Sequence, residues 1–483
     1  MSCLKRIVAG CALWLLPALA HAAPPNILFI VSEDNGPEMG CYGTPIATPH
    51  LDGLAKEGTL FRHAYVPQAG CSQSRAAFLT GLYPHQNGQI GLATWKYAMY
   101  SKTTPNVVTT LKQAGYRTGI IGKLHVNPKE AFPFDFKAIG TSNFSRKNMA
   151  NYFEQARRFM NGSRRPFYLQ VNFPDAHRPF IKQIDGLPAK PLTGADVKAL
   201  PFMGINHPEL RQQTADFYNC MMRLDTYIGR LLQVLEATGK AKDTVVVYIG
   251  DHGADVMRGK RTSYEGGVRI PMIIRWPGAR AGQRRTELVS TLDLFPTFCE
   301  IAGARVPKAL KGRSLKPLVH GQTPAWRRYL FTEFHVHSNH NPWPQRTVRD
   351  ERFKLIHNPV ATKAGVVNPG YDFTMGKKFF GTPEAELLAK APARVRAAYA
   401  LMRTPPPYEL YDLQADPHEF NNLADHPAHA RIRDRLIAEL KRWQKETHDP
   451  LADPAVARRL FQLIQNAGIA ERRPLDYKAF MKP

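Results

Sequence analysis

A cysteine and an arginine four residues apart form the most reactive pattern in this sequence. Cys71 precedes an apolar run that ends at Gly81, and this spacing predicts a helix that begins near the cysteine. Arg75 would lie one turn along on the same face, where its charge can hold an anion or lower the pKa of the thiol. Because the N-terminus of a helix also favours anions, the pattern predicts an anion site that contains a reactive side chain.

Further ionisable residues follow short apolar segments elsewhere in the chain. Such segments are typical of strands that are buried on both faces. The carboxyl ends of parallel strands lie at one edge of a sheet, where α/β proteins bind ligands. We therefore expect a single site to contain the residues that follow four of these segments: Glu33, Asp34, Lys123, His125, His177, Asp251 and His252.

The elements that position these residues predict an α/β fold. Apolar strands alternate with helical segments, a pattern that favours a mostly parallel central sheet flanked by helices. We expect strands at 26–31, 119–121, 166–171, 244–249 and 270–274, helices that begin at Thr48-Pro49 and Thr104-Pro105, and a long helix over 209–237.

The character of the sequence changes after Gly321. Three segments alternate like strands with one solvated face, and a helix is expected over 429–447. Residues 360–405 have the composition of a long irregular loop. We predict a signal peptide at 1–22, a catalytic domain at 23–325, and a smaller α+β domain with an antiparallel sheet at 326–483, which completes the substrate pocket.

The N-terminus and the composition indicate an exported protein. Lys5 and Arg6 precede a short apolar stretch and the small-x-small sequence Ala20-His21-Ala22, which predicts a cleaved secretory signal. No other apolar run is long enough to span a membrane, so we expect a secreted protein, periplasmic in a Gram-negative cell. The net charge of +25 favours polyanionic partners, and the absence of a nucleic-acid-binding motif argues against nucleic acid.

Cysteine usage does not suggest a disulfide scaffold. Four cysteines remain after the signal, and three if Cys71 is chemically converted. Cys41 and Cys299 are expected to be buried and inert. His335, His337 and His340 lack the spacing of a closed zinc site, and we expect them in a surface loop near the pocket.

The motifs around Cys71 resemble the signature of the type I sulfatases, members of the alkaline phosphatase superfamily. The sequence Cys71-Ser-Gln-Ser-Arg75 is followed by Thr80-Gly81 and by Pro84-His-Gln-Asn-Gly88, with Gln73 where the family usually has Pro or Ala. In that family the cysteine is oxidised to formylglycine. Other segments are similar to the heparan N-sulfatase (sulfamidase) branch, including 119–125, 133–136 and 443–450.

The resemblance implies a metal cluster and a set of roles. Glu33, Asp34, Asp251, His252 and residue 71 would hold one divalent cation, which is Ca2+ in the family; His252, where sulfamidases have Asn, leaves Mn2+ and Zn2+ as alternatives. Formylglycine at position 71 would attack sulfur, while Arg75, Lys123 and Lys260 neutralise the sulfonyl oxygens. His177 would protonate the leaving group, and His125 would act as base when sulfate leaves.

Three functions remain open from the sequence. The resemblance implies an exported sulfohydrolase that acts on a sulfated sugar, with N-sulfoglucosamine of heparan-type glycans as the expected substrate. It also implies a formylglycine-generating enzyme as a partner and allows a homodimer. The alternatives are an O-sulfatase or a phosphate or phosphonate monoester hydrolase of the same superfamily, and an unmodified relative that binds a sulfated glycan through its basic surface.

Overall fold

The computed structural model describes residues 24–362, 365–371, 384–468 and 472–482. The predicted signal peptide therefore lies outside the described residues. Among the described residues, no helix is long and apolar enough to cross a bilayer. The chain forms two sheets, a larger one from its first 290 residues and a smaller one that begins at Leu330.

The larger sheet has nine strands in the order β4-β3-β5-β1-β6-β7-β2-β8, with β9 paired to β2. Five neighbours, β4, β3, β5, β1 and β6, run parallel, so their carboxyl ends meet at one edge. The strands are β1 (Asn26–Ser32), β2 (Thr59–Tyr65), β3 (Arg117–Ile121), β4 (Phe136–Ala138), β5 (Phe167–Phe173), β6 (Thr244–Gly250), β7 (Arg269–Arg275), β8 (Gln283–Arg285) and β9 (Val289–Ser290). This arrangement confirms the expected mostly parallel sheet, although β7 runs antiparallel to both of its neighbours.

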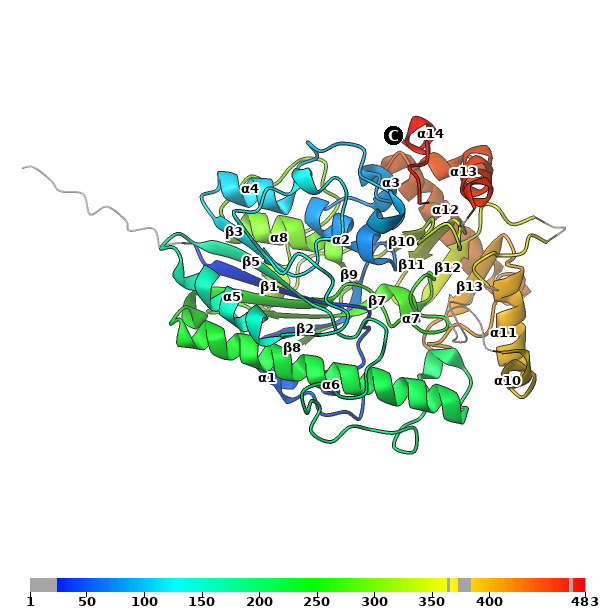
Figure 1. The fold of residues 1–483 in the computed structure, drawn as a ribbon. Helices are drawn as coiled ribbons and strands as arrows, with labels where there is room; N and C mark the ends of the chain where they lie inside the picture. The colour runs from blue at the N-terminus through cyan, green and yellow to red at the C-terminus, as the bar shows by residue number, and fades with distance from the viewer. Residues whose placement is uncertain (1–23, 363–364, 372–383, 469–471, 483) are drawn as a thin grey trace, which may run out of the picture.

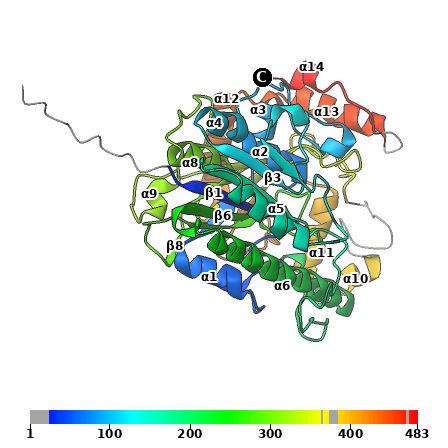
Figure 2. The same ribbon diagram turned by 60° about the vertical axis from the view of Figure 1, so that its left-hand side comes forward.

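Helices cover both faces of this sheet, as Figures 1 and 2 show. One face carries α1, α5 and α6, and the other carries α2, α4 and α8. The helices of this part of the chain are α1 (Pro49–Glu57), α2 (Cys71–Thr80), α3 (Pro84–Asn87), α4 (Val107–Gln113), α5 (Ala150–Asn161), α6 (Pro208–Ala237), α7 (Glu265–Val268), α8 (Leu294–Ile301) and α9 (Lys316–Val319).

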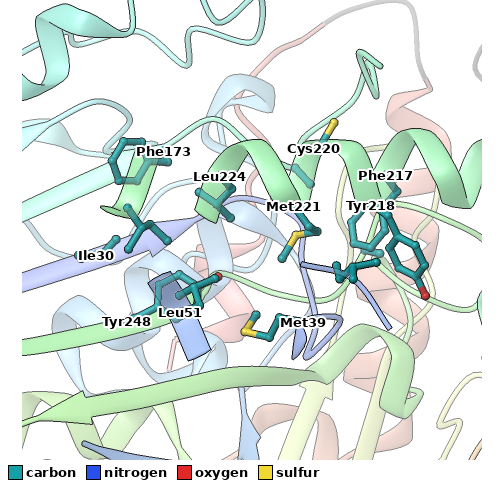
Figure 3. Packing of buried hydrophobic residues seen from close by; sticks show 14 of the residues in the cluster. Ile30, Met39, Leu51, Phe173, Phe217, Tyr218, Cys220, Met221, Leu224 and Tyr248 are labelled. Atoms are coloured by element: carbon teal, nitrogen blue, oxygen red, sulfur yellow. The ribbon is translucent and has the colours of Figure 1, made fainter. Parts of the chain in front are cut away.

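The long helix α6 is the largest single cover of the sheet. Its apolar face presents Phe217, Met221 and Leu224 toward the sheet, where Ile30 and Phe173 lie beneath them (Figure 3). These side chains are fully buried, which keeps the sheet rigid beneath the loops at its carboxyl edge. The helix agrees with the expectation for 209–237 to within one residue.

The smaller sheet is antiparallel, as expected, and has the order β10-β11-β12-β13. Its strands are β10 (Leu330–Phe334), β11 (Gln345–Arg349), β12 (Phe353–His357) and β13 (Tyr408–Asp412), and its helices are α10 (Ala385–Ala389), α11 (Ala393–Arg403), α12 (Ala430–Glu446), α13 (Pro454–Ala467) and α14 (Lys478–Met481). The two sheets fall on either side of residue 325, where we place the domain boundary. The helices of this part of the chain lie together beside the larger sheet in Figure 1.

Two local expectations were wrong. Residues 360–405 are not wholly irregular, because α10 and α11 occupy much of the described part, and Val395 and Tyr399 of α11 pack into the core. The helix expected at Thr104-Pro105 begins at Val107 instead. Asn106 is its N-cap, with a side chain that accepts a hydrogen bond from the Thr109 N–H, and this cap sets the start of the helix.

Candidate active site

Cys71 is the first residue of α2, at the end of the helix that faces the carboxyl edge of the large sheet. All ten residues of this helix are buried. Gly70 precedes it in an extended conformation, and a Cβ at this position would lie 2.6 Å from Gln73 Oε1, so a larger residue there would displace the Gln73 amide. The thiol sulfur is 3.3 Å from His252 Nε2 and 3.8 Å from Asp34 Oδ1. The helix that was predicted to begin near Cys71 is confirmed.

Gln73 has a structural role in this helix. Its side-chain amide donates to the carbonyl oxygens of Val336 at 2.6 Å and Ile90 at 3.3 Å. The residue that departs from the usual family pattern therefore fixes α2 to the segment that follows β10. No sequence pattern pointed to these two carbonyl partners.

Cations surround the thiol of Cys71. Burial alone would raise the pKa of this thiol, but Lys123, Lys260 and His252 together hold it well below its usual range. A low pKa favours the thiolate, which is the reactive form of cysteine. The site therefore stabilises negative charge at the position of residue 71.

Two buried carboxylates at the end of β1 are each paired with lysine. Lys123 Nζ lies 2.7 Å from Glu33 Oε2, and Lys260 Nζ lies 2.8 Å from Asp34 Oδ2. Burial opposes ionisation of Glu33, yet Lys123 and Arg75 lower its pKa to about 2. The pairing keeps both lysines directed into the site, where they can also meet an anionic ligand.

Arg75 is fully buried and binds protein groups through all three guanidinium nitrogens. Nη2 lies 2.9 Å from Glu33 Oε1 and 3.0 Å from Asp251 Oδ2, and Nε donates to the same Asp251 oxygen. Nη1 donates to Asn172 Oδ1 and to the Lys123 carbonyl. Arg75 thereby joins the ends of β1, β3, β5 and β6, so its geometry is that of a residue that positions the carboxylates.

His125 follows β3, and its surroundings favour the neutral imidazole. Burial, with the nearby charge of Lys123, lowers its pKa to about 4. Its ring nitrogens make no hydrogen bond of ordinary geometry to the described residues. The backbone of His125 has a φ of 56°, a conformation that few residues other than glycine adopt, and such strain is concentrated at functional sites.

His177 follows β5 on the other side of Asp34. Its Nδ1 lies 2.6 Å from the Arg178 carbonyl oxygen, so Nδ1 carries a proton and Nε2 faces the site, 3.8 Å from Asp34 Oδ2. The ring of Phe144 stacks on this imidazole at 3.7 Å between centroids and also lies over Lys123 Nζ. Sequence reasoning missed Phe144, because nothing in its local sequence marks an aromatic residue as part of a site.

His337 is a second residue that sequence reasoning assigned incorrectly. Most of the expected surface loop is buried, and His337 lies close enough to Cys71 for the two side chains to influence each other's pKa. Burial and the charges of Lys260 and Arg261 lower the pKa of His337 to about 3. His335 is also buried, where it contacts Gln68 and Arg346, so it belongs to the core and not to a sugar-binding surface.

The donor set at the sheet edge fits a single divalent cation. Ligand atoms of Asp34, Cys71, Asp251 and His252 all lie within 4.8 Å of one another, and Glu33 and His177 form a second such group with Asp34 and Cys71. His252 Nδ1 is 2.9 Å from the Gly253 carbonyl, which leaves Nε2 as the ligand atom. Asp251 and Asp34 raise the pKa of His252 to about 9 against the effect of burial, so metal binding would displace a proton.

A cavity of about 540 Å³ reaches the site from the side of β3. Lys123 and His125 line it together with Lys96, Lys129 and Lys137, and no carboxylate does so. The access route to His125 is therefore cationic and suits an anionic ligand. The structure thus brings all ten predicted site residues to one edge of the sheet.

Comparisons with known proteins agree with this geometry. The profile of the family described as "Sulfatase" matches residues 25–304, and that described as "N-sulphoglucosamine sulphohydrolase, C-terminal" matches residues 250–365. N-sulphoglucosamine sulphohydrolase of Homo sapiens is 34% identical over 93% of this chain and 95% of that protein. Arylsulfatase A of Homo sapiens is 32% identical over 85% of each chain.

Solved structures share the fold. A structure titled a 2-O GAG sulfatase has a TM-score of 0.68 at 22% identity and covers 88% of this chain and 93% of its own. The phosphonate monoester hydrolase from Silicibacter pomeroyi has a TM-score of 0.63 at 21% identity, with coverage of 88% and 96%. The family profile covers more than half of the chain and the human relative almost all of it, so this protein belongs to the sulfatase family and is a sulfuric ester or sulfamate hydrolase.

Proposed function

We propose that this sulfatase is exported and releases inorganic sulfate from the N-sulfoglucosamine of heparan-type glycans. The observation that carries the proposal is the position of Cys71, whose thiol lies between a carboxylate, a histidine and two lysines that are directed to one point. The choice of sugar is supported by the second family profile and by the relative with 34% identity.

The nucleophile in this proposal is a modified residue 71. When Cys71 is converted by a formylglycine-generating enzyme, the hydrated aldehyde supplies an oxygen nucleophile. Lys123 and Lys260 then stabilise the charge that develops on the sulfonyl oxygens, because their amino groups are fixed by Glu33 and Asp34 before substrate arrives. Arg75 acts by holding Glu33 and Asp251 in place.

Two histidines move protons in the proposed reaction. His177 Nε2 protonates the leaving nitrogen, which requires the imidazolium form, and Nδ1 stays bound to the Arg178 carbonyl. His125 is neutral because its pKa is lowered to about 4, so it can accept a proton from residue 71 when sulfate is expelled. The two roles require opposite protonation states, and burial favours the neutral form that the role of His125 requires.

Asp34, Asp251, His252 and residue 71, with Glu33 beside them, would hold the cation, and we propose Ca2+. Bound there, it supplies Lewis-acid polarisation of the sulfate group and of the nucleophile. Conversion of the thiol to an oxygen function makes the donor set harder, which favours Ca2+ over Zn2+. Added Ca2+ is expected to raise the unfolding temperature of chelator-treated protein more than Zn2+ does. A larger shift with Zn2+ would contradict the assignment of the ion.

An O-sulfatase is the second candidate, because arylsulfatase A is nearly as similar in sequence as the N-sulfohydrolase. The two reactions share the site and differ in the leaving atom. A phosphate or phosphonate monoester hydrolase has less support, since the corresponding solved structures share only the fold with this chain.

Two measurements test the proposal. The first is the mass of the tryptic peptide that contains residue 71, from protein produced in its own host, where we expect the aldehyde. The second is sulfate release from N-sulfoglucosamine and from glucosamine 6-O-sulfate at equal concentrations, with Cys71→Ala as the control. We expect a kcat/KM for the N-sulfated sugar that is at least about tenfold higher.

The outcomes separate the candidates. An intact thiol in every peptide would refute the formylglycine mechanism and favour a sulfated-glycan-binding relative. A preference for the O-sulfated sugar would select the O-sulfatase. Hydrolysis of a phosphonate monoester to a phosphonate and an alcohol that is faster than release of sulfate from either sugar would reject both.

A further inference from the structure

We propose that a second hollow, remote from Cys71, binds a sulfated oligosaccharide and so holds the polymer from which this enzyme removes sulfate. The inference rests on the proposed function, because it takes the substrate to be part of a sulfated glycan. The hollow has a volume of about 380 Å³ and lies between the segment 311–331 and helix α12. We call it the basic groove; its charged lining residues are Lys311, Arg313, Arg327, Arg328, Arg442 and Glu446.

The charge of the basic groove is strongly unbalanced. Five cationic side chains line it and only one carboxylate does. Arg327 is paired with the buried Asp293, and Arg442 with Glu439 and Glu446. Within the described part of the chain, no carboxylate lies within ion-pair distance of the remaining three cations, Lys311, Arg313 and Arg328. These three exposed side chains leave a local positive potential that a polyanion can neutralise.

An aromatic side chain holds two of the cations at the groove. Trp326 is half-buried, and the guanidinium groups of Arg313 and Arg327 lie over its ring, 5.9 Å and 5.3 Å from the ring centroid. Such cation–π contacts fix the position of a guanidinium group. The groove therefore offers positioned positive charge, which suits the sulfates of a sulfated sugar.

Three further aromatic side chains line the groove together. Trp443 is only 4% exposed, and its ring stacks on Phe331 at 5.1 Å between centroids and meets Tyr83 edge-on at 5.0 Å. This cluster gives the groove an apolar wall beside its cations, a combination that is typical of ligand-binding sites.

The groove is separate from the active site. Tyr83, which also lines it, follows the C-terminal end of α2, whereas Cys71 begins that helix. A ten-residue helix is about 15 Å long, so a ligand in the groove does not touch the reacting atoms. Binding at a second point raises the local concentration of a polymeric substrate at the catalytic site without changing the chemistry.

The test compares two triple variants in their affinity for a heparin-derived octasaccharide at fixed salt. The groove variant is Lys311→Ser, Arg313→Ser and Arg328→Ser. The control variant is Arg157→Ser, Arg164→Ser and Arg165→Ser, which removes the same charge from exposed side chains at α5 and the loop after it. We expect the groove variant to bind at least about tenfold more weakly, and the control to bind within about twofold of wild type, because the control side chains lie outside the groove and do not line the cavity at His125.

Several outcomes would overturn the inference. Equal loss in both triple variants would show that net charge alone attracts the glycan. Wild-type affinity in the groove variant would place the glycan elsewhere. Two results with the wild-type protein would refute recognition of a sulfated sugar. One is an affinity for the de-sulfated octasaccharide equal to that for the sulfated one. The other is an equal affinity for a single-stranded oligonucleotide of the same charge.

Hydrolysis assays distinguish failure of this inference from failure of the proposed function. Both triple variants are expected to keep the wild-type kcat/KM on monosaccharide N-sulfoglucosamine, since neither changes the site around Cys71. Absence of sulfate release by the wild-type protein would refute the proposed function while leaving the binding comparison valid. Folding of each variant is checked by its unfolding temperature.

Discussion

At the scale of single residues, Arg75 holds the carboxylates of the acidic cluster in place. Its guanidinium group bridges Glu33 and Asp251, and all three groups are buried. Solvent therefore cannot stabilise a charge that loses its partner. Removal of one partner from a buried charge pair is far more costly than the pair is worth, because the other charges stay buried. The residue therefore couples the stability of the protein to the arrangement of its site.

We predict that Arg75→Ala lowers the free energy of unfolding by about 3–5 kcal/mol and abolishes activity. Arg75→Lys retains the charge but loses the bidentate geometry, so its loss of stability should be smaller while activity still falls. Urea denaturation monitored by circular dichroism gives the free energies. A wild-type free energy of unfolding for Arg75→Ala would contradict the role assigned here.

His177 allows a prediction that depends on the leaving group. We expect His177→Ala to lower kcat by about 10²–10⁴-fold for a sulfamate or alkyl sulfate, since general acid catalysis is lost. The loss should be much smaller for an aryl sulfate such as nitrophenyl sulfate, whose leaving group needs no proton. Steady-state kinetics on both substrates measures the difference. An equal loss on the two substrates would indicate a role in binding instead.

Single residues also mark the limit of what the sequence predicted. Side chains at the ends of β1, β3, β5 and β6 were predictable, because apolar strands followed by ionisable residues are a local pattern. Phe144 and His337 were not, since each enters the site from a distant segment through tertiary packing. Their contacts with His177 and Cys71 arise only when the chain is folded.

At the scale of elements, the short helix α7 connects the two sheets. Its first residue, Glu265, lies 3.0 Å from Arg349 of β11, 3.1 Å from Lys354 of β12 and 2.9 Å from the Tyr65 hydroxyl of β2. Burial would raise the pKa of this carboxyl, but Lys354 and Arg349 lower it from 4.5 to about 2. The ionised form is therefore favoured in the folded protein.

A group with a lowered pKa in the folded state stabilises the protein above its unfolded pKa, and this contribution is lost as the pH falls toward the folded value. For Glu265 the contribution is complete above about pH 4.5 and is lost as the pH falls to about 2. We predict that Glu265→Gln lowers stability at pH 7 by on the order of 2 kcal/mol and flattens the pH dependence between pH 5 and about pH 2. Denaturation midpoints across this range measure it; an unchanged slope would contradict the prediction.

Element types were more predictable than their pairing. The strand at β7 was expected from its apolar run, but its antiparallel direction depends on how it pairs with the preceding strand β6 and with β2, which lies far away in sequence. Helix α11 was missed because proline and glycine residues around it suggested a loop. Its apolar residues can be recognised as one face of a helix only once their packing into the core is known.

At the scale of the whole molecule, the C-terminal segment packs back against the N-terminal part of the chain. The Tyr477 hydroxyl lies 2.9 Å from the Gly88 carbonyl and 2.8 Å from the Ala98 carbonyl, and it accepts from the Ala98 N–H at 3.0 Å. The last described residues thereby reach back to the loops that follow α3. Residues nearly four hundred positions apart are joined at one buried hydroxyl.

We predict that Tyr477→Phe lowers the free energy of unfolding by about 1–3 kcal/mol, because the buried Ala98 N–H loses its acceptor. The matched control is Tyr408→Phe, in a half-buried tyrosine whose hydroxyl has no hydrogen bond among the described residues. The control should stay within about 0.5 kcal/mol of wild type. Thermal unfolding compares the two variants, and similar losses in both would contradict the assigned role.

The cysteines are free and buried across the described chain. Burial raises the pKa of Cys41, Cys220 and Cys299 to about 12, so these thiols are unreactive, as expected for the first and the last. Among the described cysteines, Cys71 alone has a thiol whose pKa is lowered by its surroundings. The absence of disulfides among the described residues agrees with the expectation from cysteine usage.

The burial of α2 also bears on when residue 71 could be modified. Cys71 is 2% exposed, and every residue of the helix around it is enclosed by the core. Another enzyme cannot bind the segment 71–75 once the chain has folded around it. If residue 71 is converted as proposed, the conversion would therefore act on the nascent or unfolded chain, and a molecule that folds first would keep its thiol.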